Sequence, residues 1–277
     1  MTPGPSQRIY CVDAEWKGRV NCARCGIRYL MLFSELPETA FSGLLYAIDN
    51  LSYEPGTALY EEGRHGNALY SIREGLVKLV SRVDDGDERI VRLLGFGSTI
   101  GLELLESGTA YRHSAIALDK LDVCRIPLPT ILELESKFPE LCRQIRQRLQ
   151  QELNQADLWI SALNTGPARR RLAHLLLIQT DIGADRRGNI QLLRRDDMAA
   201  MIGVSMETAS RIIAEFKREG LLSKVGPNLF HADTERLTAL AGRTPYLGAD
   251  AVPRHAAPDD DAGNARSTRD QPLPTLD

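Results

Sequence analysis

The chain has 277 residues, of which 34 are Lys or Arg and 37 are Asp or Glu, so that its formal net charge at pH 7 is -3. This balance excludes a protein that is basic over its whole surface, as a non-specific nucleic-acid coat would be, although it leaves room for a local basic face. The length and the apolar content, 43% of residues, suffice for two domains with cores of their own.

No run of about 18 or more apolar residues occurs, and the N-terminal MTPGPSQRIY lacks the apolar core of a secretory signal. We therefore expect a cytoplasmic protein that enters no membrane. Five cysteines, an odd number, fit poorly with a disulfide scaffold and better with a reducing compartment, where thiolates can bind metal. Cys11, Cys22 and Cys25 cluster early, whereas Cys124 and Cys142 stand apart.

Short apolar stretches, broken by glycines at turn positions, run from Leu51 to Pro127. Apolar and polar residues alternate in SIREGLVKLVSRV and DERIVRLL, as in half-buried strands, and DDG at 84–86 between them predicts a hairpin turn. The sequence therefore predicts an antiparallel sheet rolled into a sandwich or jelly roll. We assign this domain to 33–128, behind an N-terminal cysteine-containing segment at 1–32.

Apolar residues at helical spacing predict one long helix from Thr130 to Leu163, in a segment of its own at 129–164. They alternate steps of three and four, the spacing of a two-stranded coiled-coil seam: Ile145, Leu149, Leu153, Ala156, Ile160 and Leu163. We therefore expect a homodimer joined through the 130–163 helix. The alternative is a helix that lies against its own domain.

The sequence Asn164-Thr165-Gly166-Pro167 ends this helix as a hinge, and a second domain follows at 165–245. Its pattern predicts helices at 168–179, 196–202 and 206–219, a strand at 189–193, and a hairpin-like wing in GLLSKVGPNLF. Residues 246–277 are rich in Pro, Asp and Ala and lack periodic apolar residues, which predicts a disordered tail.

A short helix, a glycine and a second helix in this domain have the spacing of a helix-turn-helix. Gly203 permits the tight turn, Ser205 can cap the second helix, and Glu207 complements the positive end of its dipole. Glu207, Ser210 and Arg211 project from one face of the N-terminal half of that helix, where major-groove base edges would meet a carboxylate, a hydroxyl and a guanidinium.

The alternative is that Glu207 and Arg211 form a surface ion pair, worth roughly a few tenths of a kcal/mol. The complete helix-turn-helix favours double-stranded DNA as the partner. The residues expected at DNA are Glu207, Ser210, Arg211, Ser205, Thr208, Lys217 and Lys224, and Arg169, Arg170 and Arg195 are further candidates for phosphate contacts.

The stretch from Leu192 to Leu222 resembles the DNA-binding signature of the CRP/FNR family of bacterial transcription regulators. The resemblance extends over roughly Phe33 to Gly242, with turns at Gly56, Gly63, Gly75 and Gly86. It implies an α+β fold: an N-terminal antiparallel β jelly roll of the cyclic-nucleotide-binding type that acts as a sensor, a long dimerisation helix and a C-terminal winged helix-turn-helix. Glu207, Ser210 and Arg211 match the FNR branch, which implies TTGAT-like inverted repeats and contact with RNA polymerase as an activator.

The resemblance also bears on the signal that the sensor domain reads. Family members that bind a cyclic nucleotide need a glutamate for the ribose and an arginine-serine pair for the phosphate. This chain has Leu102 at the glutamate position, and His113 interrupts the arginine and serine. Glu103 would serve only if the backbone shifted. The sequence therefore disfavours a cyclic nucleotide as the ligand.

The cysteines resemble those of the FNR branch, which implies a [4Fe-4S] cluster that senses oxygen or redox state. Cys22 and Cys25 match a C-x-x-C pair, and Cys124 matches a central ligand, but Met31 stands where the branch has another cysteine. Four thiolates ordinarily hold such a cluster, and Cys11 is the candidate for the fourth. Arg24 and Arg28 would favour deprotonated sulfur.

Other interpretations of the cysteines remain open: a thiol or disulfide switch at Cys22 and Cys25, zinc, or no sensing role, with regulation by haem or abundance. Cys142 is more consistent with packing. No convergent set of catalytic residues occurs, and the five histidines are scattered, so the sequence indicates no enzyme beyond a weak dithiol candidate in CARC.

Overall fold

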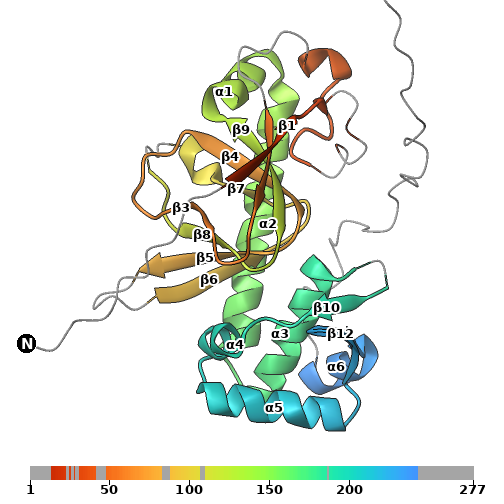
Figure 1. Ribbon diagram of the computed structural model, residues 1–277. Coiled ribbons are helices and arrows are strands. Elements are labelled where there is room, and N and C mark those ends of the chain that lie inside the picture. Colours follow the sequence, from red (N-terminus) through yellow and green to blue (C-terminus); the bar gives the residue numbers. More distant parts are fainter. Residues whose placement is uncertain are drawn as a thin grey trace, which may run out of the picture.

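The computed structural model describes residues 14–22, 25, 28, 31–41, 48–82, 88–106, 110–185 and 187–242. Within them, an N-terminal β domain and a smaller C-terminal domain lie toward the two ends of a long helix (Figure 1). The hairpin turn predicted at 84–86, the tail at 246–277, Arg24 and Cys11 lie outside the described residues.

The N-terminal domain contains two antiparallel sheets, with the strand orders β1-β2-β9-β4-β7 and β3-β8-β5-β6. Side chains from both sheets, including Tyr70 of one and Val77 of the other, share one buried core, which confirms the predicted antiparallel β domain. The strands are β1 Ala14–Arg19, β2 Asp49–Tyr53, β3 Ala58–Tyr60, β4 Ala68–Glu74, β5 Val77–Arg82, β6 Glu88–Leu94, β7 Thr99–Ile100, β8 Ser114–Ala117 and β9 Leu121–Pro127, with short 3-10 helices η3 Glu38–Phe41 and η5 Leu102–Leu105.

The prediction of one continuous helix from Thr130 to Leu163 is wrong, because two helices occupy this range. Helix α1 spans Leu128–Lys137 and α2 spans Pro139–Leu163. Phe138 between them is extended, with φ -131° and ψ 92°. A proline disfavours helical backbone in the residue before it and lacks the N–H that a continuing helix would use, so the chain bends at this point.

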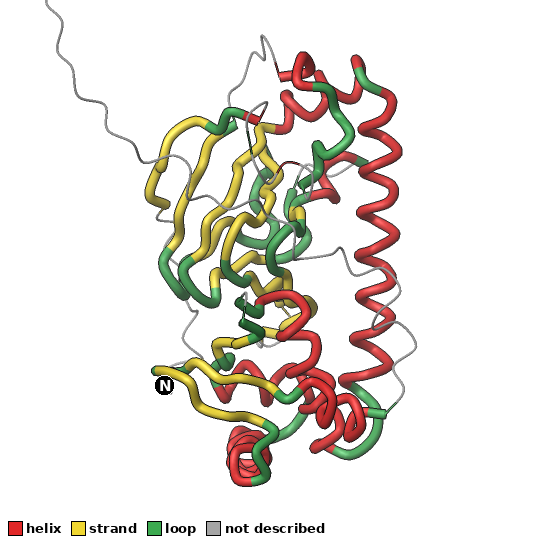
Figure 2. The backbone as a smooth tube through the Cα atoms, turned by 90° about the vertical axis from the view of Figure 1, so that its right-hand side faces the viewer, coloured by secondary structure: helices red, strands yellow, loops and turns green. Residues whose placement is uncertain are grey.

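Helix α2 runs along one side of the molecule (Figure 2). Only part of its predicted apolar stripe is exposed. Ile145 and Leu163 are buried within the chain, whereas the side chains of Leu153 and Ile160 are 55% and 64% exposed. The apolar surface available to a second copy is therefore the middle of the predicted stripe. No helix in the described part of the chain is long and apolar enough to cross a lipid bilayer.

The C-terminal domain is a winged helix-turn-helix, as predicted. A three-stranded sheet with the order β10-β12-β11 includes the wing hairpin. Met198, Phe216 and Leu237 are completely buried in its core. The elements are α3 Ala168–Gly183, β10 Asn189–Gln191, α4 Arg195–Ile202, α5 Met206–Arg218, β11 Leu222–Gly226, β12 Leu229–Ala232 and α6 Thr234–Ala241.

Candidate DNA interface and thiol group

The turn between α4 and α5 is formed by Gly203 and the two residues after it. Gly203 ends α4 in the left-handed conformation, with φ 63° and ψ 51°, which glycine adopts without the steric cost of a side chain. Ser205 begins α5 as its N-cap, because its hydroxyl accepts a hydrogen bond of 3.2 Å from the backbone N–H of Thr208. The turn and the cap predicted from the sequence are both confirmed.

Helix α5 separates a buried face from a polar face. Ala209, Ile212, Ile213 and Phe216 are buried against the rest of the domain. Glu207 and Arg211 are exposed, and Ser210 between them is half-buried. The three side chains therefore lie on the half of the helix that faces away from the core, as the helical spacing predicts.

The electrostatic setting of Glu207 comes from the helix terminus rather than from Arg211. Hydrogen bonding to its own backbone N–H, followed by the Ser205 hydroxyl, holds the pKa of Glu207 below its usual value. Among the ion pairs of the described residues, none joins Glu207 to Arg211. The alternative of a surface ion pair is therefore not supported by the geometry, and both groups remain available to an external partner.

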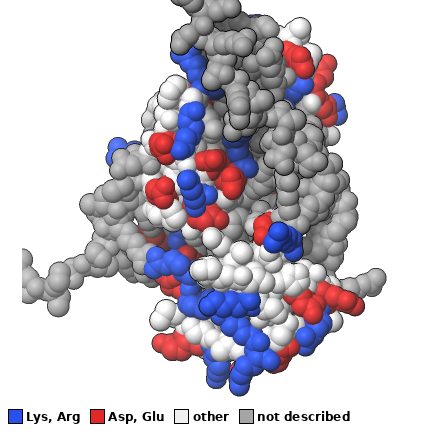
Figure 3. All heavy atoms as spheres, turned by 45° about the vertical axis from the view of Figure 1, so that its right-hand side comes forward, with Lys and Arg blue, Asp and Glu red and all other residues white. Residues whose placement is uncertain are grey.

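A second polar group lies at the wing. The Lys217 ammonium is 4.2 Å from the centroid of the Phe230 ring. Burial lowers the pKa of Lys217, and the positive charges of Arg195 and Lys224 act in the same direction, so the three cations lie close together. On the face of the molecule that Figure 3 shows, Lys and Arg side chains gather over the C-terminal domain. Such a concentration of cations suits a phosphate backbone.

Two of the arginines expected at phosphates instead hold helices of the domain together. The Arg169 guanidinium is 4.9 Å from the Phe216 ring centroid and pairs with Glu215 and Glu219 of α5 and its C-cap. Arg170 donates from Nε to the carbonyl oxygen of Ala241 at 2.6 Å. These contacts tie α3 to α5 and α6, and they leave Arg195, Lys217 and Lys224 as the better phosphate candidates.

Three of the predicted sulfur ligands converge at the other end of the molecule. Cys22 and Cys124 are buried in the same core cluster, and Cys22 interacts electrostatically with Cys124 and with Cys25. Burial raises the pKa of Cys22 to about 12. Burial also raises the pKa of Cys124, although the neighbouring Arg73 acts in the opposite direction. We call Cys22, Cys25 and Cys124 the thiol group.

Arg73 is a residue of this site that the sequence did not reveal. It comes from β4, and its Nη1 donates to Cys124 Sγ at 3.6 Å across the β4–β9 pair, while its charge also interacts with Cys25. Only the strand register brings Arg73 next to Cys124, 51 positions along the chain. The guanidinium supplies a positive charge that would favour thiolate over thiol.

The described residues fit a metal centre in donor type but not in arrangement or number. No group of three or more His, Cys, Asp or Glu among them is placed to hold a metal ion. The four described cysteines are free thiols. Met31, at the position where the sequence resemblance expects another cysteine ligand, is buried. Soft sulfur donors suit iron, but the three described thiols of the thiol group are not placed to hold a metal ion as they stand, and a fourth donor has to come from elsewhere.

Cys142 is separate from the thiol group. Its sulfur donates to a carboxylate oxygen of Glu135 at 3.7 Å, from a half-buried position between α1 and α2.

The segment that would hold the ribose of a cyclic nucleotide contributes to the core instead. Leu102 is only 3% exposed and packs in the same core as Cys22 and Cys124. Glu103 faces outward enough to accept from the backbone N–H of Arg112, at 3.4 Å. Leu102, which the resemblance aligns with the ribose-binding glutamate, thus directs an aliphatic side chain into the core.

Two family models match the chain. The "Cyclic nucleotide-binding domain" model matches residues 50–137, and the "Crp-like helix-turn-helix domain" model matches residues 170–240. The first covers most of the β sandwich and α1, and the second covers α3 to α6, so each falls on one of the two domains.

Among curated proteins, the Fumarate and nitrate reduction regulatory proteins of Salmonella typhi and of Escherichia coli K12 are each 28% identical to this chain over 230 residues, which is 81% of this chain and 92% of theirs. Among solved structures, the chain resembles a CRP-family transcriptional regulator from Thermus thermophilus, with a TM-score of 0.59 and 25% identity over 70% of this chain and 97% of that one. It also shares the fold of FixK2 from Bradyrhizobium japonicum, with a TM-score of 0.64 and 22% identity over 72% of this chain and 99% of that one.

Proposed function

Because the chain belongs to the CRP/FNR family of transcription regulators, which are DNA-binding proteins and not enzymes, we propose that it acts as a homodimer on TTGAT-like inverted repeats and responds to oxygen or redox state through a [4Fe-4S] cluster. The observation that carries the DNA part is the polar face of α5. On this face Glu207 and Arg211 are exposed, and Ser210 lies between them. Neither of the two charged side chains forms an ion pair with another described residue.

The side chains on this face match the chemistry of base edges. A guanidinium donates two parallel hydrogen bonds to guanine O6 and N7, a carboxylate accepts from the cytosine amino group, and a hydroxyl does either. Arg195, Lys217 and Lys224 would meet the phosphates beside the groove. Ser205 and Thr208, at the N-terminus of α5, add a hydroxyl pair where a helix end favours anions.

The homodimer is supported by the exposed apolar residues of α2. Leu153 and Ile160 are seven positions apart, and both are more than half exposed on a helix whose surface is otherwise polar. Large apolar residues at this spacing form a coiled-coil seam when a second helix covers them. A two-fold dimer presents two copies of α5, which is the arrangement that an inverted repeat requires.

The proposed cluster would be held by Cys22, Cys25 and Cys124, with Cys11 as the fourth ligand. A bound [4Fe-4S] cluster would supply an oxygen-labile redox centre at this end of the molecule. The side chain of Arg73 would remain beside Cys124 and offset part of the negative charge of the thiolates. Uptake of the metal has to release the protons that burial now holds on Cys22 and Cys124.

The runner-up is a regulator with the same DNA target and no cluster. Sensing by thiol oxidation is disfavoured by the burial of Cys22 and Cys124. Thiolates are the reactive species, and the raised pKa values keep both cysteines protonated near neutral pH. Regulation by haem or by abundance has no supporting feature in the described residues.

Purification without oxygen tests the cluster. We expect a brown protein with broad visible absorbance and about four iron atoms per chain. Replacing Cys22 by Ala should abolish the colour and the iron, because it removes one ligand of the set. The matched control is Cys142→Ala, which changes a cysteine outside the thiol group and should retain both. A colourless, iron-free protein that still binds DNA would refute the cluster and leave the DNA part standing.

A further inference from the structure

The C-terminal domain packs directly onto the β sandwich of its own chain. Leu76 and Leu93 of the sandwich are buried in the same core as Ile182 at the end of α3 and Met198 of α4. The two domains are therefore joined by a continuous apolar contact, beyond the hinge at residues 164–167. We call this contact the domain interface.

Two glycines set how closely the domains approach at the domain interface. A Cβ added at Gly95 would lie 2.1 Å from the backbone carbonyl oxygen of Ile182, so the two backbone segments would have to move apart. A Cβ at Gly183 would lie 2.8 Å from the Leu76 side chain. The end of α3 thus rests against the sandwich with no room for a further methyl group, so the interface is closely packed.

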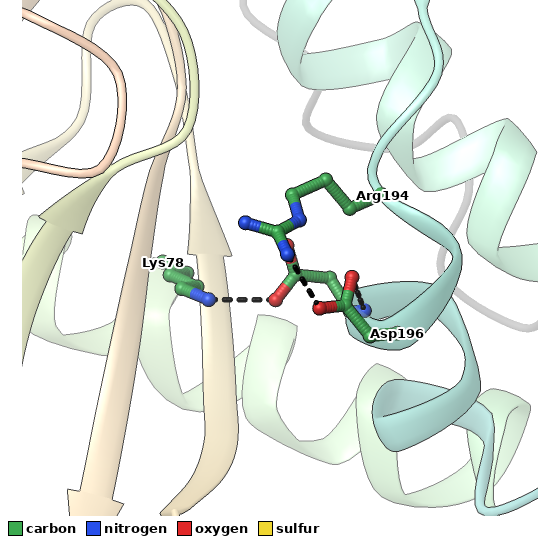
Figure 4. Close-up of polar contacts among 4 residues, drawn as sticks. Lys78, Arg194 and Asp196 are labelled. Carbon is green, nitrogen blue, oxygen red and sulfur yellow. Dashed lines mark hydrogen bonds and ion pairs between the residues drawn. The ribbon is translucent and has the colours of Figure 1, made fainter. Parts of the chain in front are cut away.

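Among the residues that the structure describes, one ion pair crosses the domain interface. Lys78 Nζ of β5 lies 2.6 Å from Asp197 Oδ1 in the first turn of α4, and the two side chains are only 12% and 9% exposed. Figure 4 shows the Lys78 side chain reaching from the strand to the helix, with the separate Arg194–Asp196 pair beside it. A nearly buried ion pair contributes little net stability but demands one geometry, because either charge left alone would be costly.

This ion pair holds helix α4, which leads through a short turn into α5. Helix α4 is the first helix of the helix-turn-helix and is joined to α5 by Gly203, Val204 and Ser205, which have defined hydrogen bonds. Helix α5 lies at the end of the molecule opposite α1 (Figure 1). Glu207 and Arg211 on its polar face are exposed. A contact that fixes α4 relative to the sandwich therefore also fixes the direction of the recognition face.

We propose that Lys78 is a positioning residue for DNA recognition, which through Asp197 holds the helix-turn-helix at one orientation on the sandwich. The inference rests on the proposed binding of an inverted repeat by a homodimer. In such a dimer, α2 sets the distance between the two chains, and the domain interface sets where each α5 lies relative to α2. Preorganisation of this kind avoids an ordering cost on binding and selects one separation of the half-sites.

The test compares DNA affinities at several half-site separations, without oxygen. Wild-type protein is titrated with a duplex carrying the inverted repeat, with duplexes carrying one or two extra base pairs between the half-sites, and with a duplex carrying a single half-site. Each added base pair rotates the second half-site by about 35°. Lys78→Met should weaken binding to the correct repeat by about tenfold and flatten the spacing preference, with no change on the single half-site.

Two further variants separate positioning from a general loss of structure. Asp196→Asn removes the neighbouring ion pair within the C-terminal domain and should behave as wild type. The charge swap Lys78→Asp with Asp197→Lys restores an ion pair of the same reach and should recover the spacing preference. Thermal unfolding of each variant shows that it is folded.

The inference fails if Lys78→Met discriminates between half-site separations as sharply as wild type, or if the charge swap recovers nothing while remaining folded. Failure of the proposed function itself looks different, because in that case the wild-type protein would show no preference for the repeat at any separation.

Discussion

Arg211 provides the sharpest residue-scale test of base recognition. It is exposed on the N-terminal half of α5 and forms no ion pair with Glu207. Arg211→Ala should weaken binding to the inverted repeat by about 1 to 3 kcal/mol per half-site and leave weak non-specific binding nearly intact. The measurement is a titration with the repeat and with a scrambled duplex at one fixed salt concentration.

The matched control is Arg218→Ala, which removes an arginine from the last turn of the same helix. It should cost far less on the repeat than Arg211→Ala does. If Arg211→Ala weakened binding equally on every sequence, Arg211 would be a phosphate contact and the proposed base recognition would lose its guanidinium.

Individual residues were predictable where the governing contacts are local. The cap at Ser205 and the shared face of Glu207 and Arg211 follow from helical spacing alone, and the structure has both. The partners of Arg169 and Arg73 were not predictable. They depend on how α3 packs on α5 and on the register of β4 with β9, and neither relation is encoded in neighbouring residues.

At the scale of single elements, the N-cap of α5 can be tested by removing its hydroxyl. Ser205→Ala leaves the Thr208 N–H without its partner, which should destabilise the first turn of α5 by about 1 kcal/mol and accelerate amide exchange there by about fivefold. Hydrogen exchange followed by mass spectrometry measures this directly. Ser205→Asn supplies another capping oxygen and should exchange as slowly as wild type. Unchanged exchange in Ser205→Ala would mean that the cap contributes nothing.

The boundaries of elements show where periodicity misleads. The apolar period continues from α1 into α2, and this continuity hid the break at Phe138 even though Pro139 stands directly after it. A proline disfavours helical backbone in the residue before it, so Pro139 is the local signal that marks the break. Helix α3 also extends to Gly183, beyond the predicted residue 179, and its last turn packs closely against Leu76 and Gly95 of the sandwich.

At the scale of the whole molecule, composition and glycine spacing predicted the two domains and the helix between them, and the described residues have this organisation. The domain interface was beyond such reasoning. Gly95 and Ile182, or Lys78 and Asp197, are brought together only by the packing of complete domains, and nothing in their own surroundings in the sequence marks them. The same applies to the division of the α2 stripe between the chain's own cores and solvent.

The central claim is that two copies of α5, paired through α2, read one inverted repeat. Its most direct test is a titration of the purified chain with a duplex carrying the repeat and with a scrambled duplex, at near-physiological salt, under oxygen-free and aerated conditions. We expect a preference for the repeat of at least about a thousandfold without oxygen. Leu153→Glu, which places a charge on the exposed part of the α2 stripe, should abolish that preference by separating the chains. Equal affinity of the wild-type protein for both duplexes, with and without oxygen, would contradict the account.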